Sequence, residues 1–437
     1  MTVYLICYGA GMLFASSAHY YLSGACLMAA AVYLYFYDYR RTGNPLHLRA
    51  LFSLFWVGGE GISCLKLSRL QTDWSLETWA VFFVAFTAFW TVFHFLTPGE
   101  GQTGQISGGE KRLTLGAEDS RGLFEVILIL TAVSFCAFLL EAAVLGYVPF
   151  FVRGVPHAYS YFHISGVHYV TVSCVLVPAF SVVLFLGDRT LSAGKRTAVS
   201  LACAVSLLIP VLCVSRFQLI FAVILGVLTY MLTSGRKKLR YLFAATAALL
   251  PVYVVLTIAR SHDVAYLNGI FEMKNSRMPI FITQPYMYIA NNYDNFNCLV
   301  EQLPEHAMGL KGMFPLWALT GLKFLRPELV NFPIYTTKEE LTTVTLFYDA
   351  YYDFGIAGVF FFSCLLGAAA AWLSEKMKTA GHPVWFLVGG QMALYFMLSF
   401  FTTWFSNPTT WFYFAVTGAA ALYIRIRKKI RVRRSLR

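Results

Sequence analysis

The chain has 437 residues, of which 58% are hydrophobic and only 13% are charged, and its formal net charge is +12. Its mean hydropathy of +0.61 excludes an ordinary soluble protein, because too few polar side chains are present to cover a water-exposed surface of this size. The nine cysteines are scattered and form no C-x-x-C pair, so neither a zinc site nor a disulfide framework is indicated.

Apolar runs recur from end to end, and each is about long enough to cross the hydrocarbon core as a helix. Helices are expected because backbone groups in lipid must be hydrogen-bonded within their own segment. The sequence therefore predicts an all-α fold, a polytopic transmembrane bundle of about 12 helices in a single membrane domain. The first two runs are short and could together make one re-entrant feature. The runs are 2–17, 20–37, 50–66, 77–97, 122–146, 166–187, 197–214, 217–233, 241–258, 354–373, 383–402 and 410–424.

Positive charges distinguish the two sides of the membrane. With the N-terminus inside, the inner loops and the tail from Arg425 carry 23 of the 34 lysines and arginines. The outer side carries 11, of which seven lie in one long loop, and long translocated loops are largely exempt from the charge bias. We therefore expect both termini in the cytoplasm. The basic tail is interpreted as a topological anchor beside anionic lipid, and no nucleic acid partner is expected.

Residues 259–353 are predicted to form a large extracytoplasmic loop within the membrane domain, far longer than two helices need. The loop is rich in Tyr, Phe, Trp and Pro, which is not typical of disorder, so we expect short amphipathic helices on the outer surface. The inner stretch 98–121 is rich in Gly and poor in aromatic residues, and this composition is typical of a flexible linker.

Two arginines lie at the outer ends of apolar runs. Arg216 lies between runs joined by almost no loop, where a purely structural turn would more cheaply use Gly or Asn. Arg260 begins the large loop, beside His262 and Asp263. Because guanidinium groups present a planar fork of donors, two of them could hold a diphosphate without a metal. The alternatives are interface snorkelling for Arg216 and a water-facing helix end for Arg260.

Glu60 lies well inside the third run, between glycines that would admit another helix or a lipid chain. A buried carboxyl there suits a general acid or base, and charged groups inside a bilayer tend to mark function. The alternative is a structural partner for an arginine on a neighbouring helix. Glu141, near the outer end of the fifth run, is expected to be structural.

Carboxylates and aromatic rings come together in residues 346–358. Asp349 and Asp353 are four residues apart and would share a helical face, with Tyr352 beside them. Carboxylates accept hydrogen bonds from sugar hydroxyls and aromatic rings stack on sugar C–H faces, so these residues could bind a sugar. The alternative is an aromatic interface belt with a helix N-cap.

Several motifs of known chemistry are absent. The run from Gly104 to Gly109 has part of the spacing of a P-loop, but Glu110 follows where a lysine is needed. No Asp-x-Asp, His-Glu-x-x-His or Gly-x-Ser-x-Gly sequence occurs, and the histidines fit no metal-site spacing. An ATP-driven pump and a nucleotide-sugar transferase are therefore disfavoured, and no cofactor or metal is expected.

Three features of the layout are shared with a known family. The segment SRFQLIFAVILG opens a helix on the outer side, a large outer loop follows the next helix, and YYDFGIAG opens the helix after it. Together with about a dozen helices, they resemble bacterial oligosaccharide repeat unit polymerases, the Wzy-type O-antigen polymerases. The stretch ITQPYMYIANNYDNF, residues 282–296, resembles the start of that family's long loop, and it makes Tyr293 a further sugar-binding candidate. The resemblance covers about residues 50–420.

The resemblance implies a metal-independent, inverting glycosyltransferase with a GT-C-like fold, which needs no cofactor. Its donor and acceptor would be undecaprenyl-diphosphate-linked oligosaccharides at the outer face of the bacterial cytoplasmic membrane, and its product an O-antigen, capsule or exopolysaccharide. Arg216 and Arg260 match the family's diphosphate-binding arginines by context, and Arg153 is a third candidate. Glu60, His262 and Asp263 are candidates for the catalytic base. A partner that regulates chain length is a further expectation.

Three other functions compete with this one. An O-antigen ligase would pass the same donor to lipid A core and would share the arginines and the outer loop. A lipid-linked glycan flippase would be expected to show internal repeats and charges at mid-membrane, whereas the charges here gather at the outer face. A purely structural scaffold would explain neither Glu60 nor Arg216.

Overall fold

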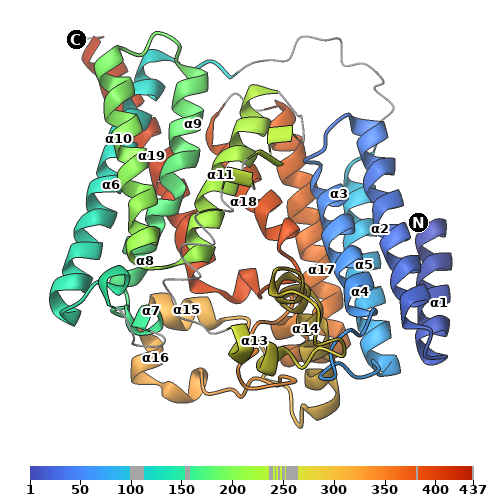
Figure 1. Ribbon diagram of the computed structural model, residues 1–437. Coiled ribbons are helices and arrows are strands. Elements are labelled where there is room, and N and C mark those ends of the chain that lie inside the picture. The colour runs from blue at the N-terminus through green and yellow to red at the C-terminus, as the bar shows by residue number, and fades with distance from the viewer. Residues whose placement is uncertain are drawn as a thin grey trace. The chain divides into compact units, whose positions relative to one another are not determined.

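Figure 1 shows the computed structural model of the chain, which describes residues 1–98, 113–152, 158–235, 264–379 and 382–435, together with residues 240, 241, 243, 244, 247, 248 and 251. The described residues form helices joined by turns, and they contain no β-strand. The all-α prediction is therefore confirmed for this part of the chain.

Seven of the described helices are long and apolar enough to cross a membrane, as the sequence predicts for a polytopic membrane protein. Two shorter apolar helices, α1 (Thr2–Ser16) and α18 (Val384–Met397), accompany them. The expected runs 50–66 and 410–424 are not among the seven. The run 241–258 lies mostly outside the described residues, so a total of about 12 spans stays a prediction. The seven spans are Tyr20–Thr42, Leu76–Leu96, Ala117–Leu145, Val167–Gly187, Ala193–Leu212, Arg216–Ser234 and Tyr348–Lys378.

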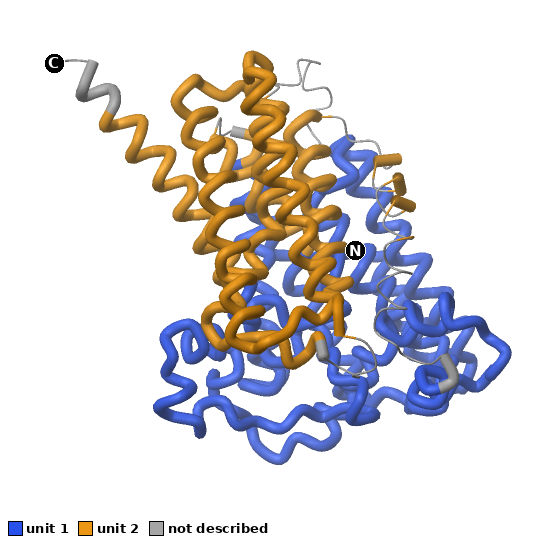
Figure 2. Tube along the Cα trace, turned by 60° about the vertical axis from the view of Figure 1, so that its left-hand side comes forward, with its two compact units in different colours: residues 1–106, 263–376, 395–410 blue, residues 107–262, 377–394, 411–437 orange. Residues whose placement is uncertain are grey.

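The chain folds into two compact units, coloured separately in Figure 2. Unit 1 comprises residues 1–106, 263–376 and 395–410, and unit 2 comprises residues 107–262, 377–394 and 411–437. The chain therefore passes between the units several times.

Unit 1 begins with a pair of antiparallel helices, α1 and α2 (Tyr20–Thr42), which lie side by side in Figure 1. The helical stretch 48–63 follows and packs on α2; it consists of α3 (Leu48–Phe52), one π-helical turn (Ser53–Val57) and α4 (Gly58–Ser63). Gly61 permits this close packing, because a Cβ at Gly61 would lie only 3.0 Å from the carbonyl oxygen of Gly24 on α2. The glycines beside Glu60 thus admit a neighbouring helix, as the sequence predicts.

An aromatic core joins α3, the π-helical turn and α5 (Leu76–Leu96). The side chain of Ser75 caps α5 by accepting a hydrogen bond from the Thr78 amide. From there, α5 presents aromatic rings at helical spacing toward its neighbours. The ring of Phe89 lies 4.2 Å from that of Phe52, and the ring of Phe82 lies 5.7 Å from that of Trp56, measured between centroids. Burial of these rings fixes α5 against the preceding helices.

The segment 264–347 carries α13 (Val264–Phe271), α14 (Ile280–Gln302), α15 (Phe314–Leu319), α16 (Leu322–Leu325) and a 3-10 turn (Pro327–Leu329). Short helices were expected here, and most of them are short. Helix α14 is the exception, since it has 23 residues and many of them are buried. Within unit 1 these helices gather at the end where α4 finishes and α17 (Tyr348–Thr379) begins (Figure 1).

Helix α17 contains a kink, because Phe354 and Gly355 have non-helical backbone angles. Beyond the kink, Gly367 packs on α5, where a Cβ would lie 2.6 Å from the carbonyl oxygen of Phe89.

Helix α18 ends at Met397, earlier than the expected limit of 402, because the chain turns at residues 398–401. A 3-10 turn (Trp404–Ser406) then leads to α19 (Pro408–Ser435).

Unit 2 is a bundle of helices. Its elements are α6 (Ala117–Leu145), a 3-10 turn (Pro149–Phe151), α7 (Ala158–Tyr161), α8 (Val167–Val172), a 3-10 turn (Ser173–Leu176), α9 (Val177–Gly187), α10 (Ala193–Leu212), α11 (Arg216–Ser234), and parts of α18 and α19. The apolar stretch within 167–187 is 78% buried and that of α10 only 28%, so the former is central and α10 is peripheral. Gly146 and Gly235, both with positive φ, end α6 and α11.

Candidate functional site

A buried polar cluster in unit 1 centres on Asp294 of α14, which has no exposed surface. One carboxylate oxygen accepts hydrogen bonds from Lys66 Nζ at 2.5 Å and Trp74 Nε1 at 3.0 Å. The other oxygen accepts from Gln71 Nε2 at 2.6 Å and Ser63 Oγ at 3.1 Å. Four donors from residues 63–74 therefore hold a single carboxylate. This carboxylate ties residues 264–347, called the long segment below, to the end of α4.

Two further features order the same region. Lys66 has a positive φ of 48°, a conformation that costs a non-glycine residue free energy and that the surrounding contacts must stabilise. Tyr286 donates a hydrogen bond to Gln71 Oε1 at 2.5 Å and accepts one from the Leu67 amide. Burial raises the pKa of the Tyr286 hydroxyl, so it stays protonated as this donor. The loop after α4 is thus held in one shape.

Helix α14 is polar on more than one side, which explains why hydropathy alone does not identify it as a membrane span. Its buried asparagines bond to different neighbours. Asn295 Nδ2 donates to the carbonyl oxygens of Leu341 and Thr343, and Asn292 Nδ2 donates to that of Phe400. On another face, Asn297 Oδ1 accepts from Thr78 Oγ1. The asparagines therefore anchor surrounding loops, and the helix forms the centre of the folded segment.

Glu60 lies on α4 with no exposed surface, and neither carboxyl oxygen has a hydrogen-bond partner among the described residues. The hydroxyls of Tyr4, Tyr8 and Tyr293 interact with it electrostatically. No arginine of the described chain pairs with it, so the structural alternative that the sequence left open is not observed. Burying an unpaired carboxyl costs free energy. A sugar hydroxyl could reach Glu60 only after neighbouring helices move apart.

Tyr293 requires a correction to the sequence interpretation. Its ring has no exposed surface and packs against Trp56 and Phe82, and its hydroxyl donates to the Trp56 carbonyl oxygen at 2.8 Å. It also fills the space beside Gly59, where a Cβ would clash with the hydroxyl. A ring enclosed in this way has no face for a sugar, so Tyr293 is a packing residue in this structure.

The carboxylates at the start of α17 surround Lys311, which comes from the long segment. Lys311 Nζ lies 3.5 Å from an Asp349 oxygen and 4.7 Å from the centre of the Tyr352 ring. The side chains of Lys311 and Asp349 keep 14% and 11% of their surface exposed. The sequence predicts Asp349 and Tyr352 as neighbours, and the structure adds a cation between them. We call Lys311, Asp349, Tyr352 and Asp353 the Lys311 cluster.

Asp353 has a structural role in the Lys311 cluster. Its carboxylate accepts hydrogen bonds from the amides of Lys311 at 3.0 Å and Gly312 at 2.7 Å, and the side chain is 3% exposed. These bonds fix the turn that presents the Lys311 side chain. Direct contact with a sugar is thus open to Asp349 and Lys311, whereas Asp353 holds them in position.

The kink in α17 next to the Lys311 cluster depends on Gly355, whose φ of +59° and ψ of −145° suit glycine alone. A Cβ at Gly355 would lie 3.2 Å from the ring of His306. We therefore expect Gly355→Ala to destabilise the protein by about 1–3 kcal/mol. Unfolding by SDS in mixed micelles measures this change. Gly9→Ala on α1 is the control, because no atom lies within 4 Å of that added methyl group. Equal midpoints for the two variants would contradict the strain argument.

In unit 2, Arg216 is the first residue of α11 and follows a tight turn in which Val214 has a φ of +54°. Its side chain is only 8% exposed. A snorkelling arginine keeps its guanidinium in water, so this degree of burial favours a role inside the protein. The placement is compatible with an anion-binding arginine at a helix N-terminus.

Glu141 on α6 is a structural residue, as the sequence predicts. It is fully buried, and its oxygens accept hydrogen bonds from the Ile164 amide at 2.9 Å and Thr171 Oγ1 at 2.7 Å. His168 Nδ1 lies 3.1 Å from the same carboxylate. These contacts fix the loop that leads into α8.

The remaining predicted site residues, Arg153, Arg260, His262 and Asp263, lie outside the described residues. Their roles stay predictions from the sequence. Among the residues that the structure does describe, no group of three or more His, Cys, Asp or Glu side chains is arranged to hold a metal ion.

Sequence reasoning missed Lys66, Asp294 and Lys311. Lys66 and Lys311 were counted only as charges on the outer side. Asp294 lies in the stretch ANNYDNFN, where polar residues occupy positions on every side of a helix. A surface helix would show one apolar face, so this pattern indicates a helix whose polar groups are bonded to other parts of the protein.

No family model, no curated protein and no solved structure matches this sequence.

Proposed function

We propose that the chain is a glycosyltransferase that polymerises lipid-linked oligosaccharide repeat units into a surface polysaccharide. The donor is an oligosaccharide on undecaprenyl diphosphate, and the reaction takes place at the outer face of the bacterial cytoplasmic membrane. The proposal combines the sequence resemblance with one structural observation, the Lys311 cluster at the start of a long apolar helix.

The Lys311 cluster supports a ligand that is both hydroxylated and lipid-linked. A sugar hydroxyl can accept a hydrogen bond from Lys311 and donate one to Asp349, and these side chains keep 14% and 11% of their surface exposed. They lie at the start of α17, which is apolar enough to cross the membrane. A sugar at this cluster would therefore lie at the end of a bilayer-spanning helix, where the glycan of a polyprenyl carrier would be expected.

The chemistry asked of the protein is modest, because the diphosphate is already a good leaving group. A hydroxyl of the acceptor repeat unit attacks the anomeric carbon of the donor with inversion. The new C–O bond forms as the bond to the lipid diphosphate breaks, and the acceptor proton passes to a base. We assign diphosphate binding to Arg216, Arg260 and Arg153, and the base to Glu60, His262 or Asp263. Arginine stabilises the developing charge without a metal.

The membrane arrangement proposed for this function follows from the charge bias. We propose about 12 membrane helices in a GT-C-like fold, with both termini in the cytoplasm and residues 259–353 outside. The partners would be the lipid-linked donor and acceptor, the bilayer, and a regulator of chain length.

Complementation of a strain that lacks the gene tests this function. We expect the unaltered chain to restore a ladder of glycan lengths on a gel. Arg216→Ala and Arg260→Ala are each expected to reduce polymer by about 100-fold or more and to leave single repeat units, because lost charge stabilisation at one site typically costs that much in rate. Asp349→Asn weakens a hydrogen-bond acceptor for the sugar and is expected to reduce polymer about tenfold.

Two matched variants control for nonspecific effects. Arg277→Ala and Glu340→Gln remove exposed charges of the same long segment and should leave the ladder unchanged. Unchanged polymer in both arginine variants would exclude the diphosphate-binding role. Intact polymer that stays on its lipid carrier in the gene-deletion strain would indicate a ligase instead, and would refute the polymerase.

A further inference from the structure

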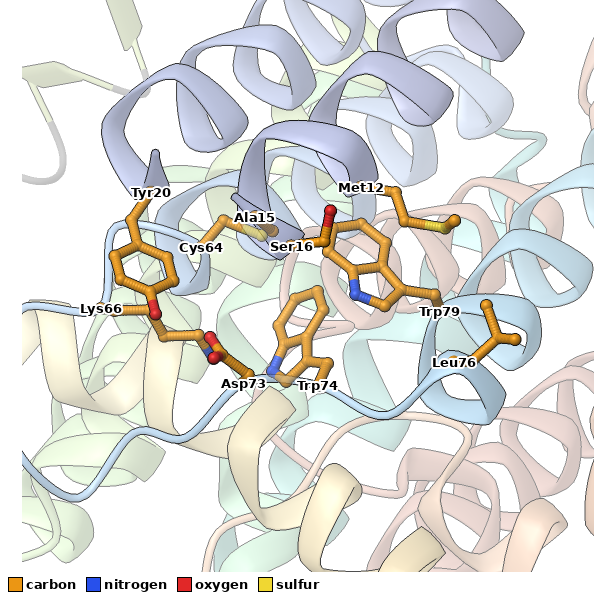
Figure 3. A pocket seen from close by; sticks show the side chains of 10 residues that line it. All are labelled: Met12, Ala15, Ser16, Tyr20, Cys64, Lys66, Asp73, Trp74, Leu76 and Trp79. Carbon is orange, nitrogen blue, oxygen red and sulfur yellow. The ribbon is translucent and has the colours of Figure 1, made fainter. Parts of the chain in front are cut away.

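A cavity of about 270 Å³ lies in unit 1; no residue of the Lys311 cluster lines it, and the function proposed above does not assign it. Its walls come from the turn between α1 and α2, from the loop after α4, and from the start of α5. Figure 3 shows the rings of Tyr20, Trp74 and Trp79 around it. It is lined by Met12, Ala15, Ser16, Tyr20, Cys64, Lys66, Asp73, Trp74, Leu76 and Trp79.

The walls of this cavity are fixed by contacts on their outer sides. Trp74 Nε1 donates to Asp294, and the backbone carbonyl oxygen of Trp79 accepts a hydrogen bond from Tyr8 at 2.6 Å. The Trp74 and Trp79 rings lie 5.0 Å apart, so each limits the movement of the other. The two tryptophans are buried, with 8% and 5% of their surface exposed. A ligand would therefore meet aromatic surfaces that are already in position.

The charges around the cavity restrict its ligand. Lys66 bonds to Asp294 and lies over the Trp74 ring at 4.7 Å, so a second cation would meet an existing one. Asp73 is exposed and faces the hydroxyl of Tyr20. The ammonium of Lys66 is paired with Asp294, so the negative charge of Asp73 is left to repel a phosphate. The cavity thus disfavours phosphates, and Lys66 disfavours an ammonium group at the face of the Trp74 ring that it already covers.

We propose that this cavity binds a neutral sugar ring of the lipid-linked glycan, with Tyr20, Trp74 and Trp79 as its aromatic walls and Asp73 as the hydroxyl acceptor. Aromatic walls with a few polar groups are typical of small-molecule sites, and a carboxylate accepts strong hydrogen bonds from hydroxyls. Ser16 lies at the same opening and offers a second hydroxyl contact. The inference rests on the proposed polymerase function and gives it a second saccharide subsite.

Binding to the purified full-length chain in nanodiscs tests the inference. The probe is the repeat-unit oligosaccharide released by mild acid from the lipid carrier of the gene-deletion strain, and titration calorimetry measures its Kd. Inorganic phosphate and glycerophosphocholine are the charged comparison probes. We expect the oligosaccharide to bind and neither charged probe to compete with it.

Two variants alter the cavity in different ways. Asp73→Asn weakens the hydroxyl acceptor and is expected to raise the Kd about tenfold, the effect of losing a charge-assisted hydrogen bond. Ala15→Trp fills the cavity and is expected to abolish binding. Leu13→Trp adds the same side chain to a position on α1 that is 65% exposed and does not line the cavity, and it should leave the Kd unchanged. Equal thermal midpoints show that all three variants are folded.

The outcomes separate this inference from the polymerase function. If the unaltered chain makes polymer and binds the oligosaccharide, but Asp73→Asn and Ala15→Trp bind it equally well, the subsite is refuted and the polymerase stands. Competition by phosphate or by glycerophosphocholine would also refute the subsite: the first would identify an anion site, and the second a site for a lipid headgroup. If the gene-deletion strain still makes polymer, the proposed polymerase function itself is refuted, whatever the binding measurements show.

Discussion

Asp294→Ala should destabilise the protein by about 3–5 kcal/mol, the usual cost of removing one partner from a buried ion pair. Four donors point at this carboxylate, and one of them is the buried ammonium of Lys66, with 5% exposed surface. Without Asp294, that ammonium donates no hydrogen bond to a side chain among the described residues and lies over the face of the Trp74 ring at 4.7 Å. SDS titration of the protein in mixed micelles measures the loss in unfolding free energy.

Two further variants make the Asp294 prediction specific. Glu301→Ala removes an exposed carboxylate from the same helix, and its effect should stay within about 0.5 kcal/mol. The double variant Lys66→Met with Asp294→Leu removes both charges and should recover most of the lost stability, because no buried charge is left unpaired. A double variant as unstable as Asp294→Ala would show that the ion pair is not the cause.

The Asp294 variant should also impair the cavity next to it. Trp74 and Lys66 line the cavity, and both bond to Asp294. Asp294→Ala is thus expected to weaken oligosaccharide binding even under conditions in which the variant is still folded. Glu301→Ala should leave the binding unchanged. Asp294 acts here as a positioning residue, since it does not line the cavity.

Asp38→Ala is expected to lower the free energy of unfolding by a similar amount. Asp38 lies on α2 of unit 1, in a second buried ion pair. Arg49 Nε donates to one oxygen of Asp38 at 2.9 Å and Nη2 donates to the other at 2.5 Å, and both side chains are almost fully buried. The Arg49 guanidinium also lies over the Trp90 ring at 4.8 Å. Leaving this arginine without its carboxylate should cost about 3–5 kcal/mol, measured by the same SDS titration.

The Asp38 prediction has its own comparisons. Arg49→Lys should also destabilise the protein, because an ammonium cannot form the two parallel hydrogen bonds of a guanidinium. Arg40→Ala, an exposed charge on the same helix as Asp38, should be nearly neutral. Should Arg49→Lys prove as stable as the unaltered chain, the bidentate geometry would not be what holds α2 to α3.

The pair of Asp38 and Arg49 illustrates the limit of charge counting. In the sequence, Arg49 contributes to the positive charge expected at the cytoplasmic face. In the structure it is 3% exposed and bonded to Asp38, so its charge is neutralised inside the protein. A lysine or arginine in a loop can serve topology, packing or both, and hydropathy does not distinguish these roles.

Local patterns predicted the helices well. Runs of apolar residues predicted the spans that the structure describes, because hydropathy and helical length are properties of contiguous residues. The segment 346–358 likewise predicted that Asp349 and Tyr352 would lie together, since one turn of a helix places them near each other. The sequence by itself thus determined the class of the protein and the approximate positions of its long helices, whereas several helix ends, such as the start of α17 and the end of α18, differ from the expected limits.

Tertiary structure alone decided which polar groups meet. Lys66 and Asp294 are 228 residues apart, and Lys311 reaches Asp349 on α17 from the loop between α14 and α15. No local pattern records such partners, because they become neighbours only after the helices pack. The same packing enclosed Tyr293, which the sequence had presented as available to a sugar. It left the carboxyl of Glu60, which the sequence expected to be buried, without a hydrogen-bond partner among the described residues. Burial and pairing depend on contacts between distant segments, so only the folded chain determined which charged and aromatic residues can reach a ligand.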